Sequence, residues 1–126
     1  MIWLVLLLAG GLGTVLRRGL GLLAVRWLGE GLPFATLVPN IAGSFVLGIV
    51  FRIGADRELC GVDARVVLGT GLLGGFTTYS SFNLETLLLV QQGAFGRALL
   101  YVASTVVACL LFGALGLKAG QFVVGG

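Results

Sequence analysis

Residues 74–83, with the sequence GGFTTYSSFN, constrain the fold of this chain more than any other stretch. They lie between two apolar runs, 66–73 and 84–90, each too short to cross a bilayer alone. Joined by the polar stretch, the runs are long enough for one crossing, which needs about 20 residues. Glycines and hydroxyls would then lie near mid-membrane, where a polar group must be buried in protein or line a polar cavity. We therefore expect a membrane protein built around this stretch.

Composition supports a membrane location. Only 10% of the 126 residues are charged and 58% are hydrophobic, whereas a soluble domain carries about 25% charged residues. The eight basic residues are dispersed, without the basic run that would indicate a nucleic-acid partner, and we expect them at helix ends near lipid headgroups. The chain has no histidine and only two cysteines, Cys60 and Cys109, which excludes the usual zinc sets, a His-based triad and a disulfide framework.

The apolar pattern predicts an all-α membrane protein with one domain over residues 1–126 and four spans, at about 2–28, 34–53, 66–92 and 98–117. The first apolar stretch continues into a long segment, so we interpret it as a span and not as a cleaved signal. The charged connection 54–65 is the one clearly water-facing loop. Pairs of small residues four apart predict close helix contacts. These pairs are Ala9 with Gly13, Ser44 with Gly48, and Gly71 with Gly75.

Arg17 and Arg18 interrupt the apolar pattern of the first span. A charge at membrane depth costs about 2.5–3.5 kcal/mol on insertion scales. Either both arginines mark the end of a helix, with residues 19–27 lying at the interface, or the helix continues and only Arg18 reaches a headgroup. Both alternatives stay open from the sequence.

Polar side chains within the second and third spans also have two interpretations each. Asn40 is either a hydrogen bond between helices or a pore-lining donor, because a buried amide must find a partner. Glu85 is the one acid within a span and lies on nearly the same face as Phe82. It either serves an ion path or makes a structural hydrogen bond to another helix, with Thr86 or the backbone of a neighbouring helix as possible partners.

The fourth span carries a polar stripe. Tyr101, Thr105 and Cys109 recur at i, i+4 and i+8, so they share one helix face. Their polar groups either bond to carbonyls of their own helix or form a polar track that faces a pore.

Four crossings would place both termini on one side of the membrane. The basic residues are then balanced, so the positive-inside rule gives no orientation. One side would hold Arg52, Arg57, Arg65 and Lys118, and the other Arg17, Arg18, Arg26 and Arg97. A chain without bias can insert both ways, and two opposite copies can pair through a self-complementary interface that brings the two polar stretches together. With Arg17 counted as a flank, this balance predicts an antiparallel, dual-topology homodimer.

Three motifs give the chain a family resemblance. They are GTVLR at 13–17, NIAGS at 40–44 and the highly specific GGFTTYSSF at 74–82. On these motifs the chain resembles the Fluc (CrcB-type) fluoride channel family over essentially its whole length. The resemblance implies a four-helix subunit with a broken third helix, paired as an antiparallel dimer with two pores and a central sodium ion. It also implies passive, non-enzymatic export of fluoride across the cell (inner) membrane, which lowers fluoride toxicity.

The resemblance also assigns roles by position. The carbonyls of Gly74 and Thr77 would hold the sodium ion. Tyr79 departs from the family pattern, which has a phenylalanine there, so the role of its hydroxyl stays open. The residues expected along the fluoride path are Arg17, Asn40, Tyr79, Ser80, Ser81, Phe82, Glu85, Tyr101 and Thr105.

The chemistry of these residues fits a small, strongly hydrated anion. Asn40 offers two N–H donors, and the two serines and Thr105 offer hydroxyls that can replace water. The edge of the Phe82 ring is positive and can face an anion weakly. Weak, repeated contacts let an ion enter without being trapped.

Three other functions fit parts of the sequence. A small cation or drug exchanger would need a membrane acid, for which Glu85 is the sole candidate. An intramembrane enzyme would have to use a Ser-Lys pair with Lys118 at a helix end. A silent assembly subunit with a kinked helix would conduct nothing by itself.

Overall fold

The computed structural model describes residues 1–125 as a bundle of long helices with one short hairpin. Helices α1, α2 and α5 are each long and apolar enough to cross a membrane. The prediction of an all-α membrane protein is therefore confirmed. In chain order the elements are α1 (Ile2–Leu28), α2 (Phe34–Ile53), β1 (Glu58–Leu59), β2 (Val62–Asp63), the π-helix η1 (Val66–Leu73), α3 (Gly74–Phe76), α4 (Tyr79–Gln91) and α5 (Phe95–Val123).

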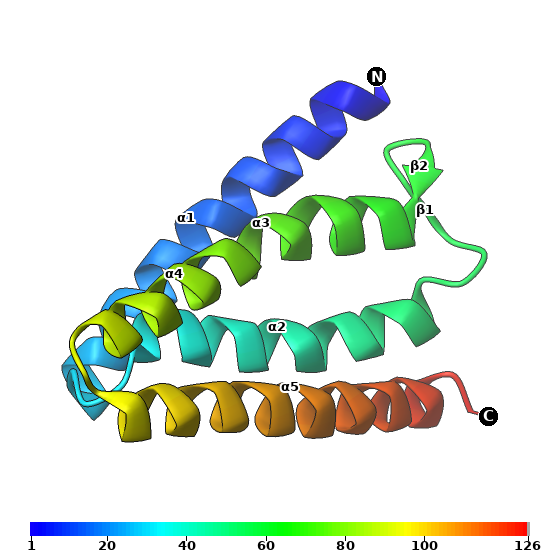
Figure 1. Cartoon of the computed structure of the whole chain (residues 1–126). Coiled ribbons are helices and arrows are strands. Elements are labelled where there is room, and N and C mark those ends of the chain that lie inside the picture. The colour runs from blue at the N-terminus through cyan, green and yellow to red at the C-terminus, as the bar shows by residue number, and fades with distance from the viewer. Residues whose placement is uncertain (126) are drawn as a thin grey trace.

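The chain runs back and forth four times, so both termini lie at one end of the bundle together with the β hairpin (Figure 1). The third passage consists of η1, α3 and α4, with a break between α3 and α4. Helix α5 begins and ends beyond the fourth span predicted at 98–117. Where the membrane begins and ends along each helix stays a prediction.

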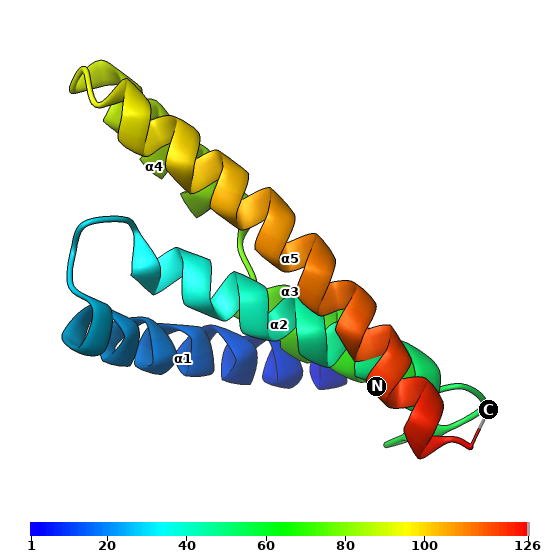
Figure 2. The same ribbon diagram turned by 90° about the horizontal axis from the view of Figure 1, so that it is seen from below.

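Glycines bring α2 and α5 into the most extensive helix–helix contact of the bundle. A methyl group at Gly116 would overlap the Phe45 carbonyl, and one at Gly48 would lie 2.6 Å from the Gly113 carbonyl. The two helices run side by side and cross at an angle (Figures 1 and 2). Gly48 therefore marks a tight helix neighbour, as its spacing from Ser44 predicts.

Helix α1 packs in the same way on the first half of the third passage. A Cβ atom at Gly71 would lie 2.9 Å from the Cβ of Ala9. A Cβ atom at Gly13 would overlap the Leu72 carbonyl. The small residues predicted to favour close contact in α1 and in the third passage therefore face one another.

Helix α1 is continuous through Arg17 and Arg18 and ends at Leu28. The alternative in which the arginines mark a helix end is therefore wrong. The helix continues because its second half is itself packed: Gly21 and Ala24 are buried, and a Cβ at Gly21 would lie 2.9 Å from a carbonyl of α2. Arg17 is half-buried and Arg18 is exposed.

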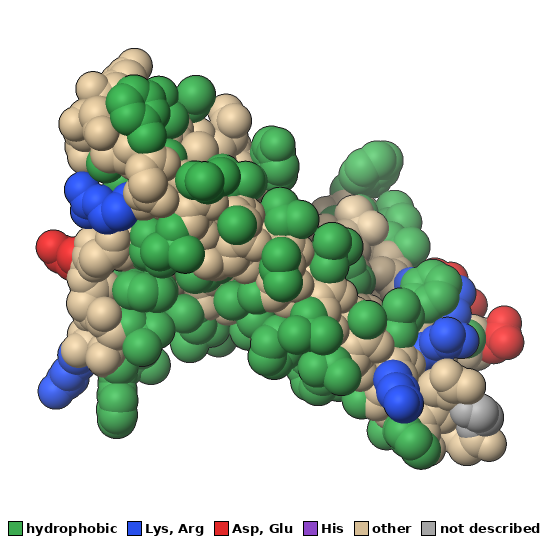
Figure 3. Space-filling view, turned by 60° about the horizontal axis from the view of Figure 1, so that its bottom comes forward, with side chains coloured by type: hydrophobic (Ala, Val, Ile, Leu, Met, Phe, Trp, Pro, Cys, Tyr) green, Lys and Arg blue, Asp and Glu red, His purple; other side chains and the backbone are tan. Residues whose placement is uncertain are grey.

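Exposed apolar side chains cover the middle of the bundle, and charged residues gather at its two ends on the face shown in Figure 3. Trp3, Leu7 and Leu110 are 80%, 70% and 71% exposed. A soluble protein rarely shows so large a continuous apolar surface. This surface fits a surrounding of lipid chains, with the charged ends near water.

Candidate functional site

The third passage is interrupted at Thr77 and Thr78, and not at the double glycine. Gly74 is helical (φ −61°, ψ −37°), whereas Thr77 (φ −96°, ψ 158°) and Thr78 (φ −151°, ψ 121°) are extended. Gly75 serves a different purpose, because a Cβ atom there would overlap the carbonyl of Gly10 in α1. The second glycine thus permits close packing, and the two threonines form the break.

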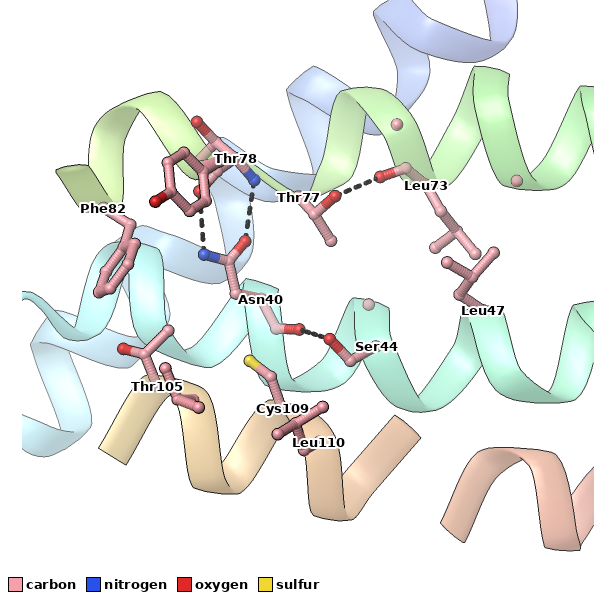
Figure 4. A pocket seen from close by; sticks show the side chains of 15 residues that line it. Asn40, Ser44, Leu47, Leu73, Thr77, Thr78, Phe82, Thr105, Cys109 and Leu110 are labelled. Atoms are coloured by element: carbon pink, nitrogen blue, oxygen red, sulfur yellow. Dashed lines mark hydrogen bonds between the residues drawn. The ribbon is translucent and has the colours of Figure 1, made fainter. Parts of the chain in front are cut away.

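Asn40 of α2 holds the break with both ends of its amide. Its Oδ1 accepts a hydrogen bond from the Thr78 N–H at 2.8 Å, and its Nδ2 donates to the Thr78 carbonyl at 3.0 Å (Figure 4). In a continuous helix the Thr78 N–H would donate to the Gly74 carbonyl instead. Asn40 is only 8% exposed, so these bonds replace helical bonds inside the protein. The interpretation of Asn40 as a hydrogen bond between helices is confirmed.

Threonine hydroxyls complete the two helix ends at the break. The Thr77 hydroxyl and the Thr77 N–H both donate to the Leu73 carbonyl at 2.9 Å, which closes the first half. The Thr78 hydroxyl accepts from the Ser81 N–H at 3.3 Å and so caps α4. The same hydroxyl lies 3.3 Å from the hydroxyl of Ser80 and 3.2 Å from that of Ser81. The two serines therefore belong to the cap of α4.

The break leaves the carbonyl oxygens of Gly74 and Thr77 without the donors of a continuous helix. The Thr78 N–H goes to Asn40, and the Ser81 N–H goes to the Thr78 hydroxyl. Unwound backbone carbonyls at half-helix ends are typical ligands for sodium in membrane proteins. Within residues 1–125 no cluster of three or more His, Cys, Asp or Glu side chains could hold a metal. The free carbonyls fit the sodium ion expected at Gly74 and Thr77, which stays a prediction.

An open groove of about 490 Å³ lies beside the break, between α2, the third passage and α5 (Figure 4). The Thr105 hydroxyl on its α5 side is buried and has no hydrogen-bond partner within residues 1–125. A buried hydroxyl without a partner is uncommon, and it can still donate a hydrogen bond to a bound ion or molecule. The polar residues that line the groove are Asn40, Ser44, Thr77, Thr78, Tyr79, Thr105 and Cys109.

Three aromatic rings follow one another beside the groove. The centroids of Tyr79 and Phe82 lie 5.6 Å apart at an interplanar angle of 71°, and those of Phe82 and Tyr101 lie 5.2 Å apart at 65°. Tyr79 is 77% exposed, whereas Tyr101 is completely buried. Phe82 lines the groove between them, with its neighbours in edge-to-face contact.

Glu85 makes structural hydrogen bonds and does not line the groove. Its two carboxylate oxygens accept from the hydroxyls of Thr36 and Tyr101, each at 2.9 Å. The predicted partner Thr86 is wrong, because its hydroxyl donates to a carbonyl of its own helix. A backbone partner is wrong too, because both partners of Glu85 are side-chain hydroxyls. Thr36 was not identified from the sequence, although its position one turn before Asn40 on the same face of α2 is a usable signal.

Arg17 reaches the break from α1. Its Nε donates to the Gly75 carbonyl at 3.1 Å. The predicted site residues thus divide into two sets. Those that line the groove are Asn40, Gly74, Thr77, Tyr79, Phe82 and Thr105. Those that contact this set or the break without lining the groove are Arg17, Ser80, Ser81 and Tyr101. Glu85 lies one contact further away, because it is bonded to Tyr101.

The fold and the site together define a class of protein. A helix that breaks inside an apolar bundle, beside a groove that several polar side chains line, is typical of polytopic membrane proteins that move ions or small solutes.

Comparison with known proteins gives the family within this class. A family profile described as CrcB-like protein, Camphor Resistance (CrcB), matches residues 4–117. A Thermus thermophilus protein named fluoride-specific ion channel FluC is 44% identical over 123 residues, which cover 98% of both chains. A protein of the same name from Sorangium cellulosum is 40% identical over 124 residues, again 98% of both chains. The chain therefore belongs to the CrcB family, as its three motifs predict.

We predict that Asn40→Asp lowers the free energy of unfolding by about 1–3 kcal/mol, because the Thr78 carbonyl loses its donor in a buried place. Thermal unfolding of the purified protein in detergent measures the change. Gln92→Glu is the matched control, since it makes the same amide-to-acid change at an exposed residue of the turn that ends α4 and should change stability by about 0.5 kcal/mol or less. Equal stability of the two variants would contradict the role of Asn40 at the break.

Proposed function

We propose that the protein is a channel that conducts fluoride passively across a membrane, without catalysis. The relatives from Thermus and Sorangium, which are 44% and 40% identical to this chain, are named for that ion. The observation that carries the proposal is the chemistry of the groove. Asn40, Tyr79 and Thr105 place hydrogen-bond donors along the groove together with the ring of Phe82, and no residue that lines the groove carries a charge.

The donors of the groove suit an anion that has lost its water. The Asn40 amide has two N–H groups, and only one of them is used by the Thr78 carbonyl. The Thr105 hydroxyl has no partner at all within residues 1–125. The exposed Tyr79 adds a further hydroxyl at the groove's edge. Together with the edge of Phe82, these groups would replace part of the hydration shell of fluoride.

The neutrality of the groove also favours conduction over tight binding. A buried lysine or arginine would hold a desolvated anion strongly, because charges attract far more in a low-dielectric interior than in water. Neutral donors bind weakly enough for the ion to leave on the far side. A channel of this kind moves fluoride down its gradient, and we propose that it exports fluoride from the cell across the inner membrane.

We propose that two copies pair as an antiparallel, dual-topology homodimer, with their grooves near the shared interface. The groove is open on its outer side, and Tyr79 at its edge is 77% exposed. Both termini lie at one end, so the basic residues divide between the two ends of the bundle. Because Arg17 contacts Gly75 within the bundle, it no longer counts as a flank, and the balance becomes four against three. This near balance still gives a weak bias at most.

A sodium ion at the centre of such a pair would be held by the free carbonyls of Gly74 and Thr77 from both copies. When bound, it would offset the negative carbonyl ends and attract anions toward the grooves. The chain's own residues leave the Gly74 carbonyl free for such an ion. The Thr78 N–H, which would bond to Gly74 in a continuous helix, donates to Asn40 instead.

Fluoride efflux from liposomes that contain the purified protein tests the proposed function. We expect fast fluoride efflux without a proton gradient and little chloride efflux. Asn40→Asp should slow efflux by about tenfold or more, because it puts a negative charge beside the anion path. Phe82→Ile should slow it roughly tenfold by removing the ring edge.

Leu84→Ile is the control for these variants, because Leu84 is 57% exposed on the same helix as Phe82 and does not line the groove. Its efflux should stay within about twofold of the unsubstituted protein. Unchanged efflux in both groove variants would contradict the assigned path. Proton-coupled uptake of a cationic drug would instead favour the exchanger.

Labelling of Cys60 tests the antiparallel pair. Cys60 is exposed in the hairpin, and Cys109 can be replaced by Ser to leave one thiol. A membrane-impermeant maleimide applied outside sealed vesicles should label roughly half of the Cys60 population, because opposite copies present it on opposite sides. Permeabilised vesicles, which should be labelled fully, are the control. Labelling of all or none of the Cys60 from outside would show a single orientation.

A further inference from the structure

The first half of the broken helix has a polar attachment to α1 that the proposed conduction path does not use. Arg17 is half-buried, and its Nε donates to the Gly75 carbonyl at 3.1 Å. Arg17 does not line the groove, whereas Gly74 and Thr77, on either side of Gly75 in the sequence, both do. The guanidinium therefore contacts the backbone next to the break from the α1 side, outside the groove.

The Gly75 carbonyl needs this donor because of the break. In a continuous helix it would accept from the N–H of Tyr79. Tyr79 begins the next helix, beyond two extended residues, so that bond is absent. A cation at the last carbonyls of a helix is also favoured by the helix dipole. Arg17 supplies both a replacement donor and a positive charge at this end.

The backbone contacts of α1 set the place from which Arg17 reaches the break. Gly10, Gly13 and Arg17 lie at i, i+3 and i+7, on one face of α1. A Cβ atom at Gly10 would lie 3.7 Å from the Gly71 carbonyl, and one at Gly13 would lie 2.9 Å from the N–H nitrogen of Phe76. The two glycines therefore fix how α1 lies along the third passage. In this register the Arg17 side chain reaches the Gly75 carbonyl.

We propose that Arg17 is a positioning residue for the ion path and not a residue that contacts the ion. It binds the Gly75 carbonyl on the α1 side and so keeps the end of the first half-helix in place, with Gly74 and Thr77 on the groove side. This inference rests on the proposed function, because the path that Arg17 positions is the fluoride path. It differs from a role as a positive charge at a pore mouth, which would act by attracting anions through water.

Salt separates these two roles. A mouth charge acts through solvent and is screened when the Debye length falls from about 10 Å at 0.1 M to about 3 Å at 1 M salt. A partly buried hydrogen bond is screened much less. We expect Arg17→Gln to slow fluoride efflux about tenfold at both ionic strengths. Arg17→Lys should recover part of the rate, because an ammonium can donate to one carbonyl but lacks the planar fork.

Arg18→Gln is the matched control, because it removes the same charge from the next residue, which is exposed. Its efflux should stay within about twofold of the unsubstituted protein. A deficit of Arg17→Gln that disappears at high salt would overturn the proposal, and so would equal deficits in the two variants. Absence of efflux from the unsubstituted protein would instead contradict the proposed function.

Amide hydrogen exchange tests the positioning role without flux. Loss of the Arg17 contact should raise exchange about tenfold at residues 76–79 relative to Arg18→Gln, with little change in α5. If Arg17→Gln does not fold, Arg17→Lys carries the same comparison and should show a smaller rise in the same place. Unchanged exchange at the break in a folded Arg17 variant would overturn the proposal.

Discussion

A backbone that leaves the helical path inside a membrane must find its hydrogen-bond partners within the protein, and this constraint organises the whole molecule. Two residues, Thr77 and Thr78, are extended in the middle of an apolar bundle. Asn40 hydrogen-bonds to both the N–H and the carbonyl of Thr78, and Arg17 donates to the carbonyl of Gly75. The partners come from two different helices, so the break is stable only while α1 and α2 both pack against it.

The same constraint explains the glycines and the groove. The neighbouring helices can bond to the break only if their backbones approach it closely, which Gly13 and Gly75 permit on the α1 side. On the α2 side, a Cβ atom at Gly43 would overlap the Thr77 side chain. What remains between α2, the break and α5 is a neutral groove with spare donors at Asn40 and Thr105. Structural support and the proposed ion path thus use the same polar groups, so one small bundle can provide both.

Much of this arrangement can be predicted from the sequence, because hydropathy and charge are local properties. The four passages, the polar centre of the third one and the importance of Asn40 all follow from the pattern. The exact position of the break cannot be predicted in this way. The double glycine suggests a break at Gly74, whereas the observed break at Thr77 and Thr78 depends on a hydrogen bond from Asn40 in another helix. The π-helical first half and the Thr36 partner of Glu85 also depend on contacts across the bundle, which no single segment reveals.

The organisation of the whole bundle depends on an extended backbone at the break in a lipid bilayer. Solid-state NMR of the labelled protein in bilayers measures this conformation through the Cα and Cβ chemical shifts of Thr77 and Thr78. We expect the chemical shifts of extended backbone at both residues, and a through-space contact between the Asn40 side-chain amide and the Thr78 carbonyl carbon. Helical shifts at both threonines, with no contact to Asn40, would contradict this expectation.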